Sequence, residues 1–437
     1  MELVLSTHQI ITLIIFAIAF GLIAIEWLEK SIIALGGGLL MILIGSITPH
    51  AAIEAIEFET IFLLLGMMML VNMASKSGIL DWLNVQIAQK TGGNPVKIFV
   101  LFSLITAVFS AFLDNVTTVI LVVPITIALL QGMGRDPRIF VLAEVLFSNV
   151  GGTLTLIGDP PNIIIGGATG LSFMDFVRNL WIPVSIISVL LMTYFLLAYR
   201  SSLQSISRNL VDLHMVNILI EKIKYRFLNQ VLHKRFIVSV LLILGITILS
   251  FLLHEVTHMP AFVTAMGGAI LLSLVCSRFI DIHHAYREVE WTTLFFFMGL
   301  FIMVGAVEHT GVLHALSEWV AGSTTNILYL CLMILWISGI VSMFLDNIPF
   351  VAVMIPVIFG IQAEFPGDTT IFWWALSMGA CLGGNGTIIG ASANVISLNI
   401  ARQHGVHITF MQYFRTAFPL TICMLLICSG YLYWLLG

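Results

Sequence analysis

One polar pattern occurs twice in this otherwise hydrophobic chain. Residues 110–115 read Ser-Ala-Phe-Leu-Asp-Asn, and residues 342–347, 232 positions further on, read Ser-Met-Phe-Leu-Asp-Asn. At the same offset Pro124 returns as Pro356, Gly151-Gly152 as Gly383-Gly384, Thr155 as Thr387, Gly158 as Gly390 and Asn162 as Asn394. A carboxylate is costly in lipid, so its presence in both halves of a duplicated chain predicts a transport pathway built by two related halves.

The composition indicates an integral membrane protein. Hydrophobic residues make up 59% of the 437 residues and charged residues only 9%, whereas soluble domains carry about 25% charged residues. The five cysteines form no CxxC pair, and the HExxH match at 254–258 lies in a loop ended by Pro260. We therefore expect no enzyme activity, no metal or cofactor and no nucleic-acid partner. The expected partners are the lipid bilayer, protons and a small molecule or ion as substrate.

Hydrophobic runs predict an all-α fold of about ten spans. They lie near 8–26, 31–48, 59–75, 138–168, 178–199, 235–253, 260–277, 291–308, 370–400 and 413–436. The first run lacks a basic n-region and a cleavage site, so we expect it to be retained. Two further runs, 96–132 and 325–361, exceed the ~20 residues of one crossing and are interrupted by Asp-Asn. Each therefore predicts a re-entrant helical hairpin, and its broken backbone must be surrounded by protein or water.

Five spans and one hairpin per half give an odd number of crossings, which predicts inverted-topology repeats. The expected division is an N-terminal repeat over 1–200, a basic cytoplasmic linker over 201–234 and a C-terminal inverted repeat over 235–437. With both termini placed outside the inner membrane, all 18 lysines and arginines except Arg178 fall on the cytoplasmic side. A cytoplasmic ATPase subunit could dock on the basic linker.

The Asp-Asn pairs at the hairpin tips have two interpretations. Asp114-Asn115 and Asp346-Asn347 could cap helices, since both residue types bond free amides in a first turn. One capping residue would suffice, however, and asparagine is less costly in lipid than aspartate. We therefore favour carboxylates that hold a cation or alternate between protonated and ionised forms.

Glycines and prolines predict breaks in two other helices. Residues 149–162 contain three glycines and the adjacent Pro160-Pro161, so a regular helix cannot continue. Residues 383–394 keep the glycines but lack the aspartate and the prolines. A packing kink of small residues is the alternative to a binding site built from freed carbonyls. Asp159, present in one half only, suggests a role in coupling or gating.

Further polar residues complete the candidate site. Thr117 and Thr118 follow the first tip and could bind substrate or bond back to their helix. Glu144 has Leu376 at the equivalent position, and we interpret it as a partner of Arg138 or Arg135. The candidate substrate and proton site consists of Asp114, Asn115, Thr117, Thr118, Asn149, Thr153, Thr155, Asp159, Asn162, Asp346, Asn347, Asn385, Thr387, Ser392 and Asn394.

Three motifs resemble the ArsB/NhaD branch of the ion transporter superfamily. They are Phe-Leu-Asp-Asn-Val-Thr-Thr at 112–118, Leu-Ile-Gly-Asp-Pro-Pro-Asn at 156–162 and Phe-Leu-Asp-Asn at 344–347. The second is similar to the P-protein subgroup. The resemblance implies inverted repeats, discontinuous helices and a homodimer. The superfamily's dicarboxylate carriers use Ser-Asn-Thr at the tips, and this chain departs from that pattern.

The expected charge of the site bears on the substrate. The predicted topology brings Asp114, Asp159 and Asp346 to membrane depth and no lysine or arginine near them. A repulsion of ~4 kcal/mol between charges ~4 Å apart would disfavour an anion. The sequence therefore favours proton-coupled efflux of neutral arsenite or antimonite. Na⁺/H⁺ antiport is the alternative, and an anion or carboxylate permease is a further alternative.

Overall fold

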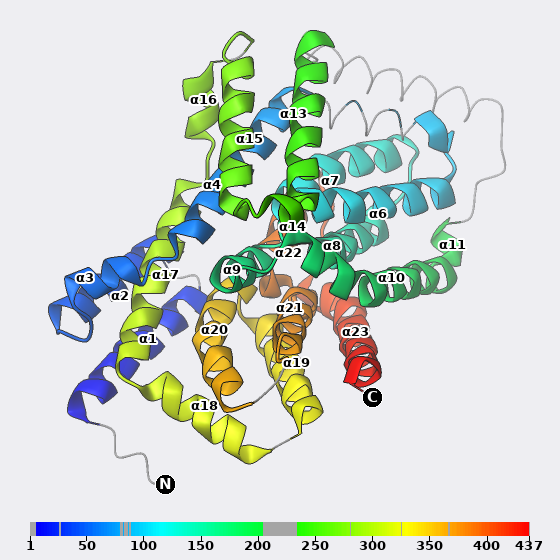
Figure 1. Cartoon of the computed structure of the whole chain (residues 1–437). Coiled ribbons are helices and arrows are strands. Elements are labelled where there is room, and N and C mark those ends of the chain that lie inside the picture. Colours follow the sequence, from blue (N-terminus) through cyan, green and yellow to red (C-terminus); the bar gives the residue numbers. More distant parts are fainter. Residues whose placement is uncertain are drawn as a thin grey trace.

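The computed structural model describes residues 6–25, 28–78, 82, 86, 89–203, 234–279, 281–324, 326–365 and 368–436. The described chain is all-helical (Figure 1). Most of the predicted linker, residues 204–233, lies outside the described residues. Ile79 and Leu80, which match Val312 and Leu313 in the sequence of the second half, also lie outside them.

The elements before residue 204 contain the first hairpin and the first broken helix. They are α1 (Thr7–Ile25), α2 (Lys30–Leu43), α3 (Pro49–Glu54), α4 (Phe58–Lys76), α6 (Pro95–Phe112), α7 (Asn115–Gly132), α8 (Arg138–Thr153), α9 (Pro160–Thr169), α10 (Phe173–Ala198) and α11 (Arg200–Leu203).

The elements after residue 233 follow a matching order. They are α13 (Lys234–Leu252), α14 (His254–Thr257), α15 (Ala261–Cys276), α16 (Ile282–Arg287), α17 (Trp291–His309), α18 (Val312–Ser323), α19 (Ile327–Phe344), α20 (Asn347–Glu364), α21 (Ile371–Gly383), the short 3₁₀ turn η1 (Ile388–Gly390), α22 (Ser392–Gln403) and α23 (Phe410–Leu436).

Nine helices of the described chain are long and apolar enough to cross a membrane. Four of them are the hairpin helices α6, α7, α19 and α20, and the others are α4, α10, α13, α17 and α23. Only five of the ten predicted spans are therefore long unbroken helices. Three others are the shorter helices α1, α2 and α15, and the remaining two are the broken pairs α8–α9 and α21–α22.

Local sequence explains where the hairpins begin and turn. The Asn94 side chain accepts bonds from the amides of Val96 and Lys97, and Pro95 occupies the first helical position of α6. The chain becomes extended at Leu113, and α7 then begins at Asn115 with Asp114 as its N-cap. The second hairpin has the same pattern: the chain is extended at Leu345, and Asp346 is the N-cap of α20.

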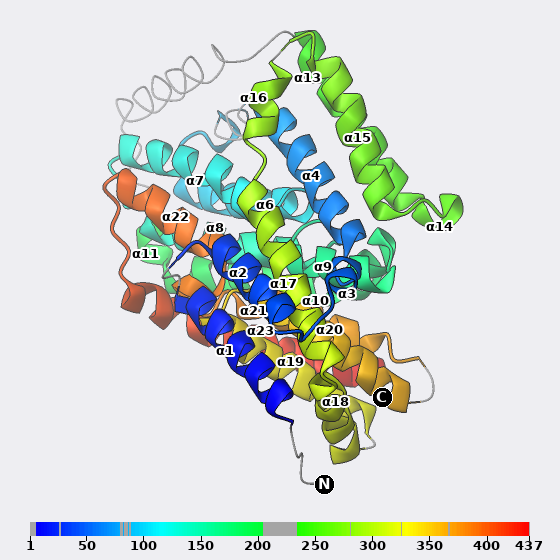
Figure 2. The same cartoon turned by 90° about the vertical axis from the view of Figure 1, so that its left-hand side faces the viewer.

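The two halves interlock through small residues. Helix α2 packs on α17 from the other half, and α15 packs on α4 (Figure 2). A Cβ added at Gly299 would lie 2.4 Å from the backbone carbon of Ala34, and one at Gly66 would lie 2.7 Å from that of Ala265. These two glycines therefore allow equivalent helices to approach closely.

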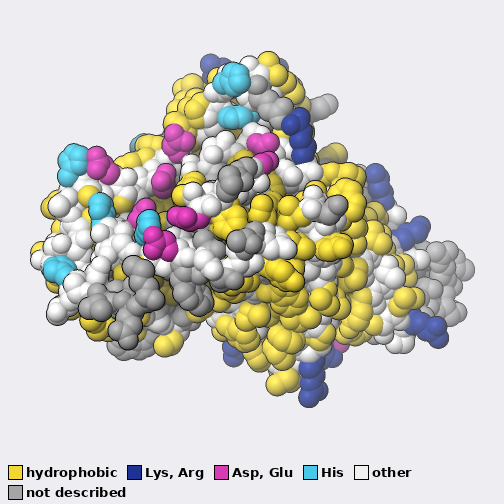
Figure 3. Space-filling view, turned by 60° about the horizontal axis from the view of Figure 1, so that its bottom comes forward, with side chains coloured by type: hydrophobic (Ala, Val, Ile, Leu, Met, Phe, Trp, Pro, Cys, Tyr) yellow, Lys and Arg dark blue, Asp and Glu magenta, His cyan; other side chains and the backbone are white. Residues whose placement is uncertain are grey.

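The outer surface fits a membrane environment. Many large apolar side chains on α1, α2, α13, α15 and α23 are exposed. Figure 3 shows a broad hydrophobic area on one face, bordered on its left by acidic and histidine side chains. A continuous apolar surface of this size is rare on soluble proteins. It supports assignment of the chain as a multi-pass membrane protein.

Substitution of the interlocking glycines should destabilise the protein. Gly66→Ala and Gly299→Ala place a methyl group against backbone atoms, so we expect each to lower the free energy of unfolding by about 1–3 kcal/mol. Gly267→Ala is the matched control, because in the described part of the chain its added Cβ would have no atom of another helix within 4 Å. Thermal unfolding in detergent measures the difference. Equal stability of Gly299→Ala and Gly267→Ala would contradict the proposed close packing.

Candidate functional site

The two hairpin tips and the two broken helices meet around a central cavity of about 250 Å³. Asp114 and Asn115 line it from the first tip, and Asp346 and Asn347 from the second. Asp159 precedes α9, and Ser392 begins α22. The cavity therefore receives polar side chains from both halves of the chain.

At the first tip, Asp114 is held by its own helix. Its Oδ1 accepts a 2.8 Å hydrogen bond from the Thr117 amide, and its Oδ2 accepts a 2.5 Å bond from the Thr117 hydroxyl. The Thr118 hydroxyl is buried and has no partner among the described residues. The capping interpretation is thus correct as local geometry. It leaves the Asp114 carboxylate at the cavity wall.

A network of amides links the first tip to the second half. Asn149 Oδ1 accepts a 3.1 Å bond from Asn115 Nδ2, while Asn149 Nδ2 donates to Asn385 Oδ1 at 2.8 Å and Asn394 Oδ1 at 2.9 Å. All four side chains are buried. Because buried amides are costly unless bonded, this network fixes how the two broken helices lie against each other.

Asp159 is the one candidate carboxylate fully enclosed beside the cavity. It is only 1% exposed, and its Oδ1 accepts a 3.3 Å bond from Asn115 Nδ2. Asn347 and Cys381 lie near it, as do the carboxylates of Asp114 and Asp346. Its Oδ2 has no hydrogen-bond partner in the described part of the chain. This oxygen is available to a proton or a cation.

Five other predicted residues serve the backbone at the breaks. Asn162 Nδ2 donates to the carbonyls of Thr153 and Thr155, and Asn394 Nδ2 donates to those of Gly384 and Thr387. The hydroxyls of Thr155 and Thr387 donate to carbonyls at the tips, those of Ala111 and Met343. The Thr153 hydroxyl bonds back to the Asn149 carbonyl at 2.8 Å. None of the five lines the cavity.

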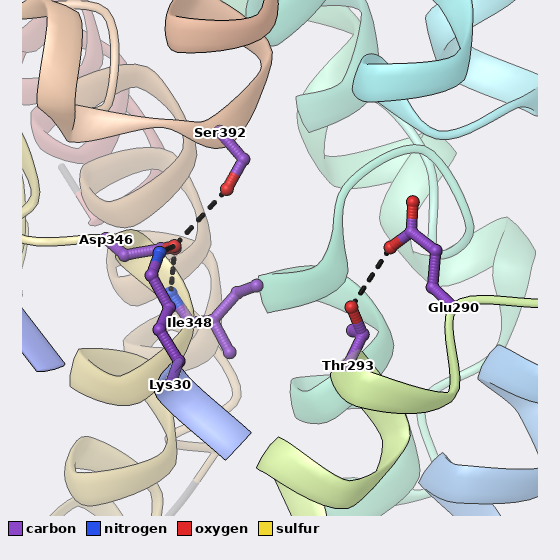
Figure 4. Close-up of polar contacts among 6 residues, drawn as sticks. All are labelled: Lys30, Glu290, Thr293, Asp346, Ile348 and Ser392. Atoms are coloured by element: carbon purple, nitrogen blue, oxygen red, sulfur yellow. Dashed lines mark hydrogen bonds and ion pairs between the residues drawn. The ribbon is translucent and has the colours of Figure 1, made fainter. Parts of the chain in front are cut away.

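The second tip contains a cation that the sequence analysis placed elsewhere. Lys30 Nζ lies 2.8 Å from Asp346 Oδ2, and the Ser392 hydroxyl donates to the same oxygen at 3.4 Å (Figure 4). The prediction that no lysine or arginine lies near the tips is therefore wrong. Lys30 begins α2, and its long side chain reaches the tip although its position in the sequence is at the end of a span.

Two glutamates at the cavity wall were also missed. Glu290 occupies the N-cap position of α17 without a side-chain bond to the helix amides, and its Oε2 accepts a 3.0 Å bond from the Thr293 hydroxyl (Figure 4). Glu288 also lines the cavity and pairs with Lys76 at 2.9 Å. Glu290 matches Glu57 in the other half, and this repetition was a signal in the sequence. Its position just before a helix, however, gave no reason to place the side chain at the central cavity.

Glu144 is not the partner of Arg138 that the sequence suggested. Its Oε1 accepts a 2.5 Å bond from the Thr126 hydroxyl, and the side chain is 1% exposed. Arg138 instead pairs with Asp136 at 2.6 Å. Arg138 begins α8, whereas Glu144 lies nearly two turns further along, where α8 packs against α6 and α7. A contact with α7 therefore replaces the expected interfacial ion pair.

Comparison with known proteins identifies related transporters. A model of the family CitMHS, described as citrate transporter, matches residues 20–379. A 46 kDa membrane protein of Mycobacterium leprae is 35% identical, and the match covers 97% of this chain and 98% of that protein. An uncharacterized transporter of Mycobacterium tuberculosis is also 35% identical over 97% of the chain.

Two further matches extend the comparison. The human P protein is 31% identical over 95% of this chain, which corresponds to 59% of its own length. The crystal structure of the Alcanivorax borkumensis YdaH transporter is similar with a TM-score of 0.60 and covers 98% of both chains. Its sequence identity is 14%, so this likeness concerns the fold alone.

Removal of the central amide should weaken the whole arrangement. Asn149→Ala leaves the side-chain oxygens of Asn385 and Asn394 without their donor and leaves Asn115 Nδ2 with only its 3.3 Å bond to Asp159, so we expect a loss of about 3 kcal/mol in unfolding free energy. Ser397→Ala is the control, because among the described residues that buried hydroxyl bonds only the Ala393 carbonyl of its own helix. Chemical denaturation in detergent compares the two variants. Similar midpoints for both would show that the amide network adds no stability.

Proposed function

We propose that this chain, which belongs to the CitMHS citrate transporter family of the ion transporter superfamily, exchanges a monovalent cation such as Na⁺ for protons through the central cavity. At the coarser level the chain is a secondary transporter and not an enzyme. The finer assignment rests on the charge of the cavity.

The observation that carries the proposal is a set of carboxylates without basic partners. Asp114, Asp159 and Glu290 line the cavity, and in the described part of the chain no lysine or arginine pairs with any of them. Lys30 and Lys76 pair with Asp346 and Glu288 instead. At an effective dielectric near 20, two unit charges ~4 Å apart interact by about 4 kcal/mol, so positive charge is favoured here.

The ligand set also suits a cation. The unpartnered Asp159 Oδ2 lies beside the first tip, where the Asp114 carboxylate and the Thr117 hydroxyl also line the cavity. Carboxylate and hydroxyl oxygens can coordinate Na⁺, and the same carboxylates can bind protons. A carboxylate that is protonated no longer attracts Na⁺ strongly. Protons and Na⁺ therefore exclude each other from the site, which is the basis of exchange.

Two other substrates are kept as alternatives. Arsenite or antimonite, the first choice from sequence, would be hydrogen-bonded as a neutral trihydroxy species by the cavity-lining Asn115, Thr117, Asn347 and Ser392. A carboxylate, as the family's name suggests, gains support from Lys30 at the second tip. Asp346 already neutralises that lysine, however, so a carboxylate would have to enter together with a cation held by Asp114 and Asp159.

Transport in liposomes separates these candidates. Purified full-length protein is reconstituted with an internal pH-sensitive dye, and Na⁺, Li⁺, K⁺, arsenite or citrate is added outside. We expect Na⁺ or Li⁺ to drive proton efflux. Asp114→Asn and Asp159→Asn should each reduce this flux roughly 10- to 100-fold, because loss of a charged ligand costs about 1.5–3 kcal/mol. Asp136→Asn, which changes a loop carboxylate, serves as the control.

Each outcome has a distinct meaning. Proton movement driven by arsenite but not by Na⁺ or Li⁺ would identify the metalloid as the substrate. Proton movement driven by citrate would identify a carboxylate as the substrate. Undiminished Na⁺-driven flux in both aspartate variants would exclude the cavity as the site of exchange.

We further propose that the halves are inverted repeats, with both termini outside and the 201–234 linker in the cytoplasm. Asp136 follows α7 and Asp368 follows α20, at equivalent repeat positions 232 residues apart. In inverted repeats these positions lie on opposite sides of the membrane. We expect a membrane-impermeant maleimide to label Asp368→Cys, but not Asp136→Cys, in intact cells. The unsubstituted chain corrects for Cys423, which is exposed. Labelling of both variants from one side would contradict the inversion.

A further inference from the structure

The two hairpin tips share Leu-Asp-Asn but hold their aspartates differently. Asp114 caps its helix through the amide of Thr117, three residues on. The equivalent residue after Asp346 is Pro349, which has no amide hydrogen. Asp346 Oδ1 instead accepts a longer bond, 3.3 Å, from the Ile348 amide. The second tip thus lacks both the amide and the hydroxyl that engage the first carboxylate.

Lys30 takes the place of those donors. Its ammonium contacts Asp346 Oδ2, and the two side chains are 25% and 13% exposed. Lys30 is the first residue of α2, and the first turn of that helix contains no acidic residue. A positive charge at the positive end of a helix dipole is unfavourable, so a neighbouring anion stabilises the Lys30 ammonium. Asp346 supplies that anion (Figure 4).

The first half of the site has no equivalent lysine. The matched contacts of Gly299 with Ala34 and of Gly66 with Ala265 align α2 with α15. Counting back four residues from each alanine places Ala261 at the position of Lys30. The charge at the second tip is therefore a specific difference between the halves.

The ion pair stands between two cavities. Lys30 and Asp346 both line a second cavity of about 250 Å³, together with Phe20, Phe344 and Pro349. Asp346 is the one described residue that lines both this cavity and the central one. A lysine has a flexible four-carbon stem and three donors, so its ammonium can move away from Asp346 within the second cavity.

We propose that Lys30 is an internal counter-ion, which the transported cation displaces from Asp346. This inference rests on the proposed cation exchange and names the residue that competes with the cation. Asp346 then carries one positive partner at every stage, either the Lys30 ammonium or the cation that enters from the central cavity. The competition weakens cation binding and assists cation release, because the ammonium returns to Asp346 as the cation leaves.

Removal of the competing charge should tighten cation binding and slow turnover, whereas a simple loss of function would not tighten binding. In liposomes we expect Lys30→Gln to lower the KM for Na⁺ by about tenfold, within the range typical of coupled binding. The maximal rate should fall as well, since release becomes slower. Lys30→Arg keeps the charge and should keep a KM close to that of the unsubstituted chain. Lys97→Gln, on the exposed side of α6, is the matched control.

A second measurement uses the unsubstituted protein and does not depend on the folding of a variant. A membrane-permeant acetylating reagent is applied in NaCl or in choline chloride, and acetylation of Lys30 is measured by mass spectrometry. Displacement from Asp346 should increase this labelling about threefold in Na⁺, with no change at Lys97.

The outcomes distinguish the two proposals. If Na⁺ drives proton flux but both the KM of Lys30→Gln and the labelling of Lys30 are unchanged, the counter-ion role is wrong and cation exchange stands. A raised KM in Lys30→Gln would also overturn the counter-ion role. If neither Na⁺ nor Li⁺ drives flux in the unsubstituted chain, the proposed function fails, and the displacement of Lys30 by a transported cation fails with it.

Discussion

The structure depends on the bonding of backbone carbonyls where two helices break inside an apolar bundle. Such carbonyls are costly in a membrane unless something donates to them. Asn162 and Asn394 solve this in the same way, each with one amide group that donates to two carbonyls. With the backbone bonded internally, both breaks can lie beside the cavity. The segments that position the aspartates and Ser392 therefore have their backbone carbonyls hydrogen-bonded within the protein and do not need water.

The same arrangement gives the two halves unequal roles. In one half the aspartate at the break is buried and has one oxygen without a hydrogen-bond partner among the described residues, and the aspartate at the tip is held by a neighbouring threonine. In the other half the break has no aspartate, and the tip aspartate is bound by a lysine. Acidic charge without a basic partner therefore concentrates on the side of the first tip. A duplicated fold has in this way become an asymmetric site.

Much of this could be predicted from the sequence, because the repeat itself was informative. The hairpins, the breaks and the meeting of Asp114 and Asp346 follow from repeated polar residues in apolar runs, and Asp159 lies in one of the repeated breaks. The roles of Thr155 and Thr387 could not be predicted. In a sequence, a repeated residue that hydrogen-bonds a backbone carbonyl cannot be distinguished from a repeated residue that binds substrate. Lys30 was misplaced because its contact depends on how α2 packs across the halves, which no local pattern records.

The interlocked packing of α2 with α17 and of α4 with α15 has a consequence for synthesis of the chain. The groove on α4 at Gly66 is filled by Ala265, which the ribosome adds 199 residues later. At ~5–20 residues per second this delay is roughly 10–40 s. During that time the newly inserted N-terminal helices lack their final neighbours. The insertion machinery or lipid must therefore cover these surfaces until the second half emerges, and the packing of α2 and α4 is completed only after α15 and α17 have been synthesised.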